Sequence, residues 1–130
     1  MKNDPAGAIG ALIFGAIEKM AATLSVSFPC RIISYDAGSG MATIQPLIRK
    51  TDSDPAPILN VPVLGQRFLV DGVERVYTPA LHAGDTVLVV CTDNELKNAL
   101  NGQIAVTNSK RSHDHNDAVI VGVFSCSLLS

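Results

Sequence analysis

The residues best suited to chemistry are two histidines that flank an aspartate late in the chain, in the run His113-Asp114-His115. Side chains at positions i and i+2 of an extended segment point to the same face, so both imidazoles could reach one ion. Several such pairs around an axis would form a site for iron or zinc. The alternative is a loop in which Asp114 and Asp117 accept hydrogen bonds from local backbone N–H groups. We favour the loop and expect no metal or other cofactor.

A hydrolytic site would need a nucleophile beside a base that an acidic group orients. Serine and aspartate are plentiful, and three histidines are present. The sequence contains neither a nucleophile-elbow motif nor the paired histidines of a metalloprotease helix. We therefore expect no catalytic residues and no enzyme activity.

Basic side chains could form a binding patch if the fold gathered them on one face, as in small barrels that hold oligonucleotides or sugars. The formal net charge of -2 argues against a partner held by phosphate neutralisation, and few aromatic residues are present for base stacking. We expect solvated positions and no specific nucleic-acid partner. The residues concerned are Arg31, Arg49, Lys50, Arg67, Arg75, Lys110 and Arg111.

Three cysteines, Cys30, Cys91 and Cys126, are widely spaced and include no C-x-x-C pair. For Cys30 and Cys91 this pattern indicates small apolar residues in a reduced compartment rather than a disulfide framework. The first apolar stretch of the chain is interrupted at Glu18-Lys19, short of the roughly 20 residues that a membrane span needs. We expect neither a signal peptide nor a membrane anchor.

A helix is predicted from about Pro5 to Leu24. Asp4-Pro5 suits a helix start, because Asp accepts hydrogen bonds from free backbone N–H groups and Pro tolerates the first helical position. Apolar residues then recur every three or four positions and form a stripe. The stripe could pack on its own domain or on a neighbouring copy, and the pattern leaves both open. Its candidate assembly residues include Ile9, Ile13, Ile17 and Met20.

The rest of the chain is organised around the apolar run Thr86–Thr92. Its β-branched residues and the Gly-Asp turn before it predict a core strand that is buried on both faces. A short helix over 93–102 should follow, because acidic residues occupy its first turn and Gly102 its end. A last strand over 118–124 is expected to close a barrel against the hairpin at residues 30–48.

Two hairpins precede the core strand. Small, flexible residues separate Cys30–Asp36 from Met41–Ile48, and an Asp-Gly turn separates Arg67–Val70 from Val73–Tyr77. Short strands and an aliphatic interior predict a mainly β fold, a five-stranded Greek-key barrel of the OB type, with an SH3-like barrel as the alternative. The expected divisions are an N-terminal helix at 1–27, the barrel at 28–126 and a C-terminal tail at 127–130.

Five runs of the sequence, in this order, resemble the N-terminal OB-fold domain of phage central spike proteins, which puncture membranes at the tip of contractile tails. The likeness covers nearly the whole chain, including a leading helix, and rests on the order and spacing of the runs rather than on one motif. The runs are Phe28–Asp36, Thr43–Ile48, Asn60–Val63, Gly84–Val90 and Lys110–Val119.

The resemblance implies a homotrimer on the tail axis, whose barrels form a collar that docks on the baseplate hub protein. It also implies a C-terminal needle that pierces the host outer membrane. Needles of this family end in iron held by a His-x-His arrangement, whereas His113 and Asp117 match the loop before the last strand of the OB domain. Only Ser125 to Ser130 follow that strand, so puncturing by this chain alone is not expected. We expect either that a separate spike tip protein supplies the needle or that the needle has been removed.

We therefore expect a virion structural protein of the tail baseplate, made in the bacterial cytoplasm. It would link the hub to the puncturing tip and meet the host outer membrane only transiently during viral entry. The alternative is a soluble OB-fold module that binds an oligonucleotide or an oligosaccharide. The oligomeric state separates the two, because only the first requires a trimer.

Overall fold

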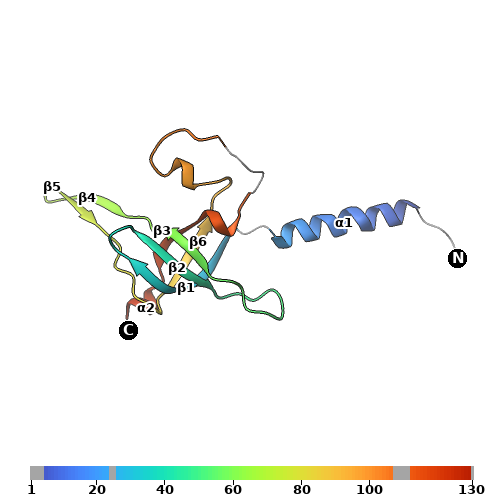
Figure 1. Ribbon diagram of the computed structural model, residues 1–130, viewed down its shortest axis with the longest axis horizontal. Helices are drawn as coiled ribbons and strands as arrows, with labels where there is room; N and C mark the ends of the chain where they lie inside the picture. The colour runs from blue at the N-terminus through green and yellow to red at the C-terminus, as the bar shows by residue number, and fades with distance from the viewer. Residues whose placement is uncertain (1–4, 24–25, 107–111, 130) are drawn as a thin grey trace.

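The computed structural model describes residues 5–23, 26–106 and 112–129, and it shows a curled β-sheet with a helix projecting from it (Figure 1). Five antiparallel strands form the sheet in the spatial order β3-β2-β1-β6-β7. The mainly β fold predicted from the sequence is confirmed. The strands are β1 (Ser27–Asp36), β2 (Met41–Pro46), β3 (Ile58–Pro62), β6 (Thr86–Cys91) and β7 (Ala118–Val123).

The two edges of the sheet meet and make it a small barrel. Val63, just after β3, forms a parallel bridge with Ile120 in β7, and the Leu64 N–H donates to the Ile120 carbonyl over 3.2 Å. This strand order is that of an OB-type Greek-key barrel. The expectation that the last strand closes against the first hairpin is wrong, because β1 already pairs with both β2 and β6 and leaves β3 as the free edge.

Strand β6 has one buried face rather than two. Val87, Val89 and Cys91 are almost completely buried, whereas the residues between them are partly exposed. Alternation of this kind is required in a small barrel, because only one face of each strand points inward. The prediction of two buried faces is therefore wrong, although the strand does belong to the core. The other strands fill the interior with Cys30, Ile32, Ala42, Ile44, Ile58, Val61, Ala118 and Ile120.

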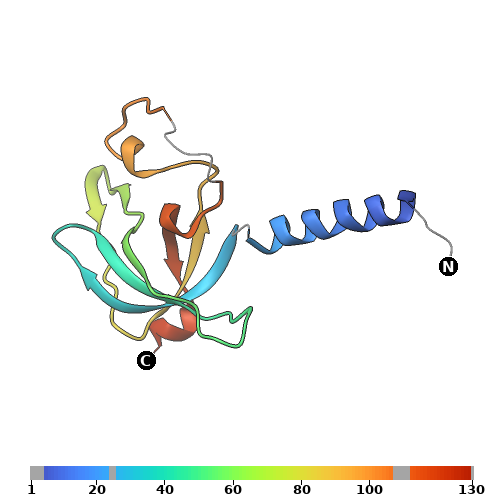
Figure 2. The ribbon, with the colours of Figure 1, turned by 45° about the vertical axis from the view of Figure 1, so that its right-hand side comes forward.

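A second sheet has two strands, β4 (Gln66–Val70) and β5 (Val73–Tyr77), and projects from the barrel as a hairpin (Figures 1 and 2). Asp71 and Gly72 form its turn, and their φ angles of 52° and 78° are both positive. Two such residues in sequence make a type I′ turn, whose twist matches that of the flanking strands. The Asp-Gly hairpin predicted from the sequence is confirmed.

Helix α1 (Pro5–Thr23) lies where the sequence predicts it, with Leu24 outside the described residues. The helix expected over 93–102 is reduced to the 3-10 turn η1 (Lys97–Ala99), because no side chain caps its start and none of its residues is buried. Two further elements were not predicted, the 3-10 turn η2 (His115–Asp117) and the helical turn α2 (Ser125–Leu128). The Ser127 hydroxyl accepts the Thr86 N–H over 2.8 Å, which holds α2 against the start of β6.

Two neighbouring isoleucines in β1 test the one-sided core. Ile32 is 1% exposed and Ile33 is 42% exposed. We expect Ile32→Ala to lower the free energy of unfolding by about 2–4 kcal/mol, because it leaves a cavity in the interior. We expect Ile33→Ala to lower it by about 1 kcal/mol or less. Urea denaturation measures both values, and equal losses would contradict a core with one face.

Candidate functional site

The two histidines of the candidate metal pair contact different groups. His113 Nε2 lies 3.0 Å from Asp93 Oδ1, and His113 Nδ1 lies 3.3 Å from the carbonyl oxygen of Cys91. The His115 ring instead packs on the ring of Phe28, with centroids 4.9 Å apart. Both nitrogens of His113 therefore face oxygen acceptors, whereas a metal ligand needs one nitrogen directed at the ion. Within residues 5–23, 26–106 and 112–129, no group of three or more His, Cys, Asp or Glu side chains could hold a metal.

Two aspartates of the same loop bind backbone N–H groups. Asp114 Oδ1 accepts the N–H of Asn116 over 2.8 Å, a local bond of the kind expected in a polar loop. Asp117 is 1% exposed, and its Oδ1 accepts the N–H of Leu96 over 3.1 Å, 21 positions away along the chain. The segment before β7 is thus tied to the segment that follows β6. The sequence did not reveal this role of Asp117, because Leu96 is its neighbour only in the folded chain.

Two of the three thiols are enclosed in the barrel. Burial raises the pKa of the Cys30 thiol from 9.0 to about 12, and the nearby Cys91 adds to the effect. Burial likewise raises the pKa of Cys91 to about 11, with smaller contributions from the acidic Asp114 and Asp117. Both side chains are therefore neutral, apolar thiols at physiological pH, whereas Cys126 is exposed on α2. These positions agree with the prediction that Cys30 and Cys91 act as small apolar residues.

Thiol labelling tests this assignment. At pH 8 a thiol reagent should modify one cysteine of the native protein quickly, Cys126, and should modify Cys30 and Cys91 only after denaturation. Native mass spectrometry counts the labels, and rapid labelling of all three cysteines would contradict an enclosed core.

The same two thiols should make the stability of the domain depend on pH. Because both ionise more readily in the unfolded chain, the free energy of unfolding should fall as the pH rises from about 9 to about 12.

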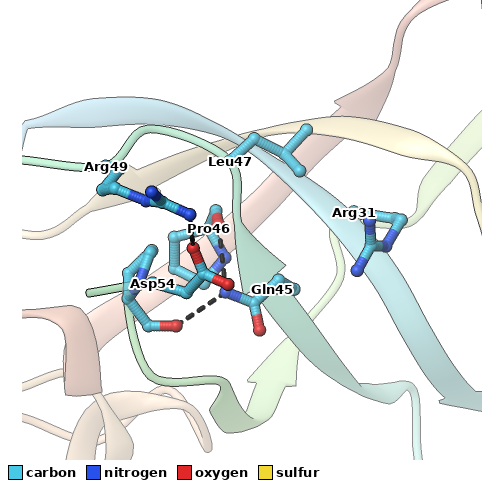
Figure 3. Close-up of a pocket in the computed structure, with 7 residues that line it drawn as sticks. Arg31, Gln45, Pro46, Leu47, Arg49 and Asp54 are labelled. Carbon is cyan, nitrogen blue, oxygen red and sulfur yellow. Dashed lines mark hydrogen bonds and ion pairs between the residues drawn. The ribbon is translucent and has the colours of Figure 1, made fainter. Parts of the chain in front are cut away.

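A groove of about 280 Å³ lies beside β1 and β2 and the loop that follows β2 (Figure 3). Gln45 fixes this loop, because its Nε2 donates to the carbonyl oxygens of Pro46 and Pro55 over 3.1 and 2.7 Å. Arg49 forms an ion pair with Asp54 along the same wall. The groove therefore has a fixed polar side that is held by hydrogen bonds within the chain.

Arg31 brings a second guanidinium group to this groove (Figure 3). It is exposed and forms no ion pair within the described part of the chain. With Arg49 and Asp54 it gives the lining a net charge of +1. Of the basic residues singled out in the sequence, the fold brings only Arg31 and Arg49 to the groove. Elsewhere lie Lys50, in the loop after β2, Arg67 and Arg75, in the hairpin, and Lys110 and Arg111, outside the described residues.

The apolar stripe of α1 is not covered by the barrel. Every side chain described from Ala6 to Met20 is exposed, and the helix points away from the sheet (Figure 2). Glu18 and Lys19 are its only charged residues, so the helix is apolar on nearly all sides. Of the two possibilities left open by the sequence, packing on its own domain is not what the structure shows. No helix in the described part of the chain is both long and apolar enough to span a bilayer.

The β4–β5 hairpin exposes large apolar side chains that the sequence analysis did not single out. On one face Phe68 and Tyr77 form an edge-on ring pair, with centroids 5.7 Å apart. On the other face Leu69 and Val76 lie beside the Arg67–Glu74 ion pair. The sequence pattern could have revealed them. Polar and apolar residues do not alternate cleanly from Gln66 to Tyr77, so apolar residues fall on both faces of the hairpin.

Comparison with known families connects this barrel to phage proteins. A family model described as the phage protein Gp138 N-terminal domain matches residues 28–122. The match begins at the start of β1 and ends within β7, so it covers the barrel and its hairpin but not α1. No curated protein sequence matches the chain. The expected relationship to a phage baseplate and spike type of protein is confirmed at the level of the family. The chain belongs to the family of the phage protein Gp138 N-terminal domain.

Proposed function

We propose that this chain is the collar of the central spike in the baseplate of a phage or phage-like contractile tail. Its role there is mechanical rather than catalytic: it links the hub protein to a puncturing tip. Family membership and the OB-type barrel support a structural phage protein. The observation that carries the proposal is the apolar helix α1, whose side chains are exposed from Ala6 to Met20 in the single chain.

In this proposal three copies assemble through α1. Most of the stability of a helix in a protein comes from packing of its apolar face, so a helix that is apolar on nearly all sides needs a partner. Burial of one Ile side chain contributes about 1.5–3 kcal/mol, and each copy offers Ile9, Ile13 and Ile17. A bundle of three helices would bury these side chains against one another. Gly10 and Gly15 have open space around them, which permits close helix contacts.

The partners follow from this position in the virion. One end of the trimer would dock on the baseplate hub, and the other would support a tip that reaches the host outer membrane only during penetration. Such a protein needs stability and fixed geometry rather than a reaction centre. We therefore propose no cofactor and no specific nucleic-acid partner.

Substitutions in α1 test assembly. We expect the parent chain to have a mass close to three times 13.7 kDa in multi-angle light scattering. The double substitution Ile13→Glu and Ile17→Glu should give a monomer, because it buries two carboxylates in the helix interface. The concentration at which half of the trimer dissociates should rise by about 100-fold or more.

Ile104→Glu provides the matched control, because Ile104 is fully exposed in the loop after η1 and lies outside the proposed interface. This variant should remain a trimer. A monomeric parent chain at micromolar concentration would refute the spike assignment. A trimer that persists in the double variant would show that α1 is not the assembly element.

A second function is supported by one feature, the groove that carries Arg31 and Arg49. In this alternative the chain is a soluble OB-fold module that binds an oligonucleotide or an oligosaccharide. Retention of the protein on single-stranded DNA that falls steeply with salt would support it. We expect no such retention, because the whole chain has a net charge of -2.

A further inference from the structure

The β4–β5 hairpin is an arm without support from its own barrel. Its two strands pair only with each other, and an isolated two-stranded hairpin is marginally stable in water. Five residues per strand give it a reach of about 17 Å. Figures 1 and 2 show it leaving the barrel on the side away from the loop after β2. The arm is therefore placed to meet another molecule rather than its own groove.

The tip of this arm carries a carboxylate between two apolar side chains. Asp71 is exposed and forms no ion pair within the described residues, whereas Glu74 is paired with Arg67 over 3.5 Å. Leu69 is 77% exposed and Val73 is 55% exposed, and they lie on different strands and opposite faces of the hairpin. The type I′ turn joins the two strands with only two residues, Asp71 and Gly72, so the end of the hairpin is short. The end of the hairpin thus presents one negative charge between exposed apolar side chains.

The groove between β1, β2 and the following loop has complementary properties. Arg31 has no ion-pair partner in the described part of the chain, and the lining as a whole carries a charge of +1. Leu47, which is exposed, and Pro55, which is half-buried, add apolar surface beside the charged groups, whereas Pro46 is buried.

We propose that the hairpin tip of one copy inserts into this groove on the next copy, with the Asp71 carboxylate against the Arg31 guanidinium. Leu69 and Val73 then pack on Leu47 and Pro55. The inference rests on the proposed homotrimer and specifies its second contact, in addition to α1. We choose a second copy of this chain as the occupant because the Asp71 carboxylate and the Arg31 guanidinium, neither of which forms an ion pair within the described residues, lie on different surfaces of the same molecule.

The contact is head to tail, since tip and groove are different patches. Contacts of this kind form a ring when the rotation closes and a filament when it does not. Three copies around the α1 bundle would close the ring. A contact between two hairpins is disfavoured, because it would bring the two Asp71 carboxylates together.

Disulfide trapping tests the contact. Val73→Cys and Leu47→Cys are combined in one chain that also carries Cys126→Ser, so that Asp71 and Arg31 remain and the exposed native thiol is removed. Mild oxidation should give covalent dimers and trimers on a non-reducing gel, and nothing larger. The control chain carries Cys126→Ser and Val73→Cys with Ile104→Cys, two exposed positions that the contact does not bring together, and should remain uncrosslinked.

Light scattering of the unoxidised variant separates the possible failures. If the protein is a trimer but no crosslink forms, the hairpin contact is refuted and the trimer stands. If the protein is a monomer and no crosslink forms, the hairpin contact and the trimer are both refuted. Crosslinked species that extend beyond the trimer would refute the closed ring.

Charge reversal provides an independent readout. Asp71→Arg and Arg31→Asp should each slow crosslinking by about two- to fivefold, as expected for loss of one exposed ion pair. The chain that carries both substitutions should recover most of the original rate. Equal rates in all four chains would refute pairing of Asp71 with Arg31.

Discussion

The structure depends on the closure of a five-stranded sheet around a very small interior. The seam is short: one parallel bridge between Val63 and Ile120, and one hydrogen bond from Leu64. Unpaired strand edges would otherwise expose backbone groups to other chains. The buried side chains are aliphatic residues, two cysteines and two aspartates, while aromatic rings reach only the margin of the core, as Phe28 and Tyr35 do. A core of this size fixes the barrel but can cover little else.

The limited core explains why so much apolar surface lies outside it. Helix α1 and the β4–β5 hairpin carry large apolar side chains that the barrel has no room to enclose. Large exposed apolar patches on a protein often mark contacts with other molecules. The two surfaces leave the barrel in different directions, so a single partner copy cannot cover both with one flat interface (Figure 1). In the proposed trimer, assembly around an axis would give each surface a partner.

The sequence was sufficient for features that depend on local chemistry. The Asp-Gly turn, the start of α1 at Pro5 and the first hairpin follow from backbone preferences, and the structure has all three. The core position of β6 followed from its apolar residues, but an uninterrupted apolar run does not tell whether the second face is covered. Leu88 and Val90 are partly exposed because a barrel has no second sheet to pack on them.

Features that depend on contacts between distant parts of the chain could not be predicted from the sequence. The partner of the last strand was misassigned, because strand pairing depends on which edge remains free once β1 has two neighbours. Gln45 could not be recognised as the residue that fixes the loop after β2, since its acceptor Pro55 lies ten positions away. The role of Asp117, whose carboxylate accepts the Leu96 N–H, could not be predicted either. A side chain that holds a distant backbone group has no spacing pattern that would reveal it.

The connection from α1 into β1 also determines how the domain would bear load. Tension on the helix enters the barrel at Ser27 and runs along β1, which pairs with β6 over its first half and with β2 over its second. Hydrogen bonds between antiparallel strands run perpendicular to the strands, so this pull shears many of them at once. Peeling β1 away would break them one after another and would need less force. If the proposed collar is loaded along β1, its strand pairing would resist that pull in shear, the direction in which it is strongest.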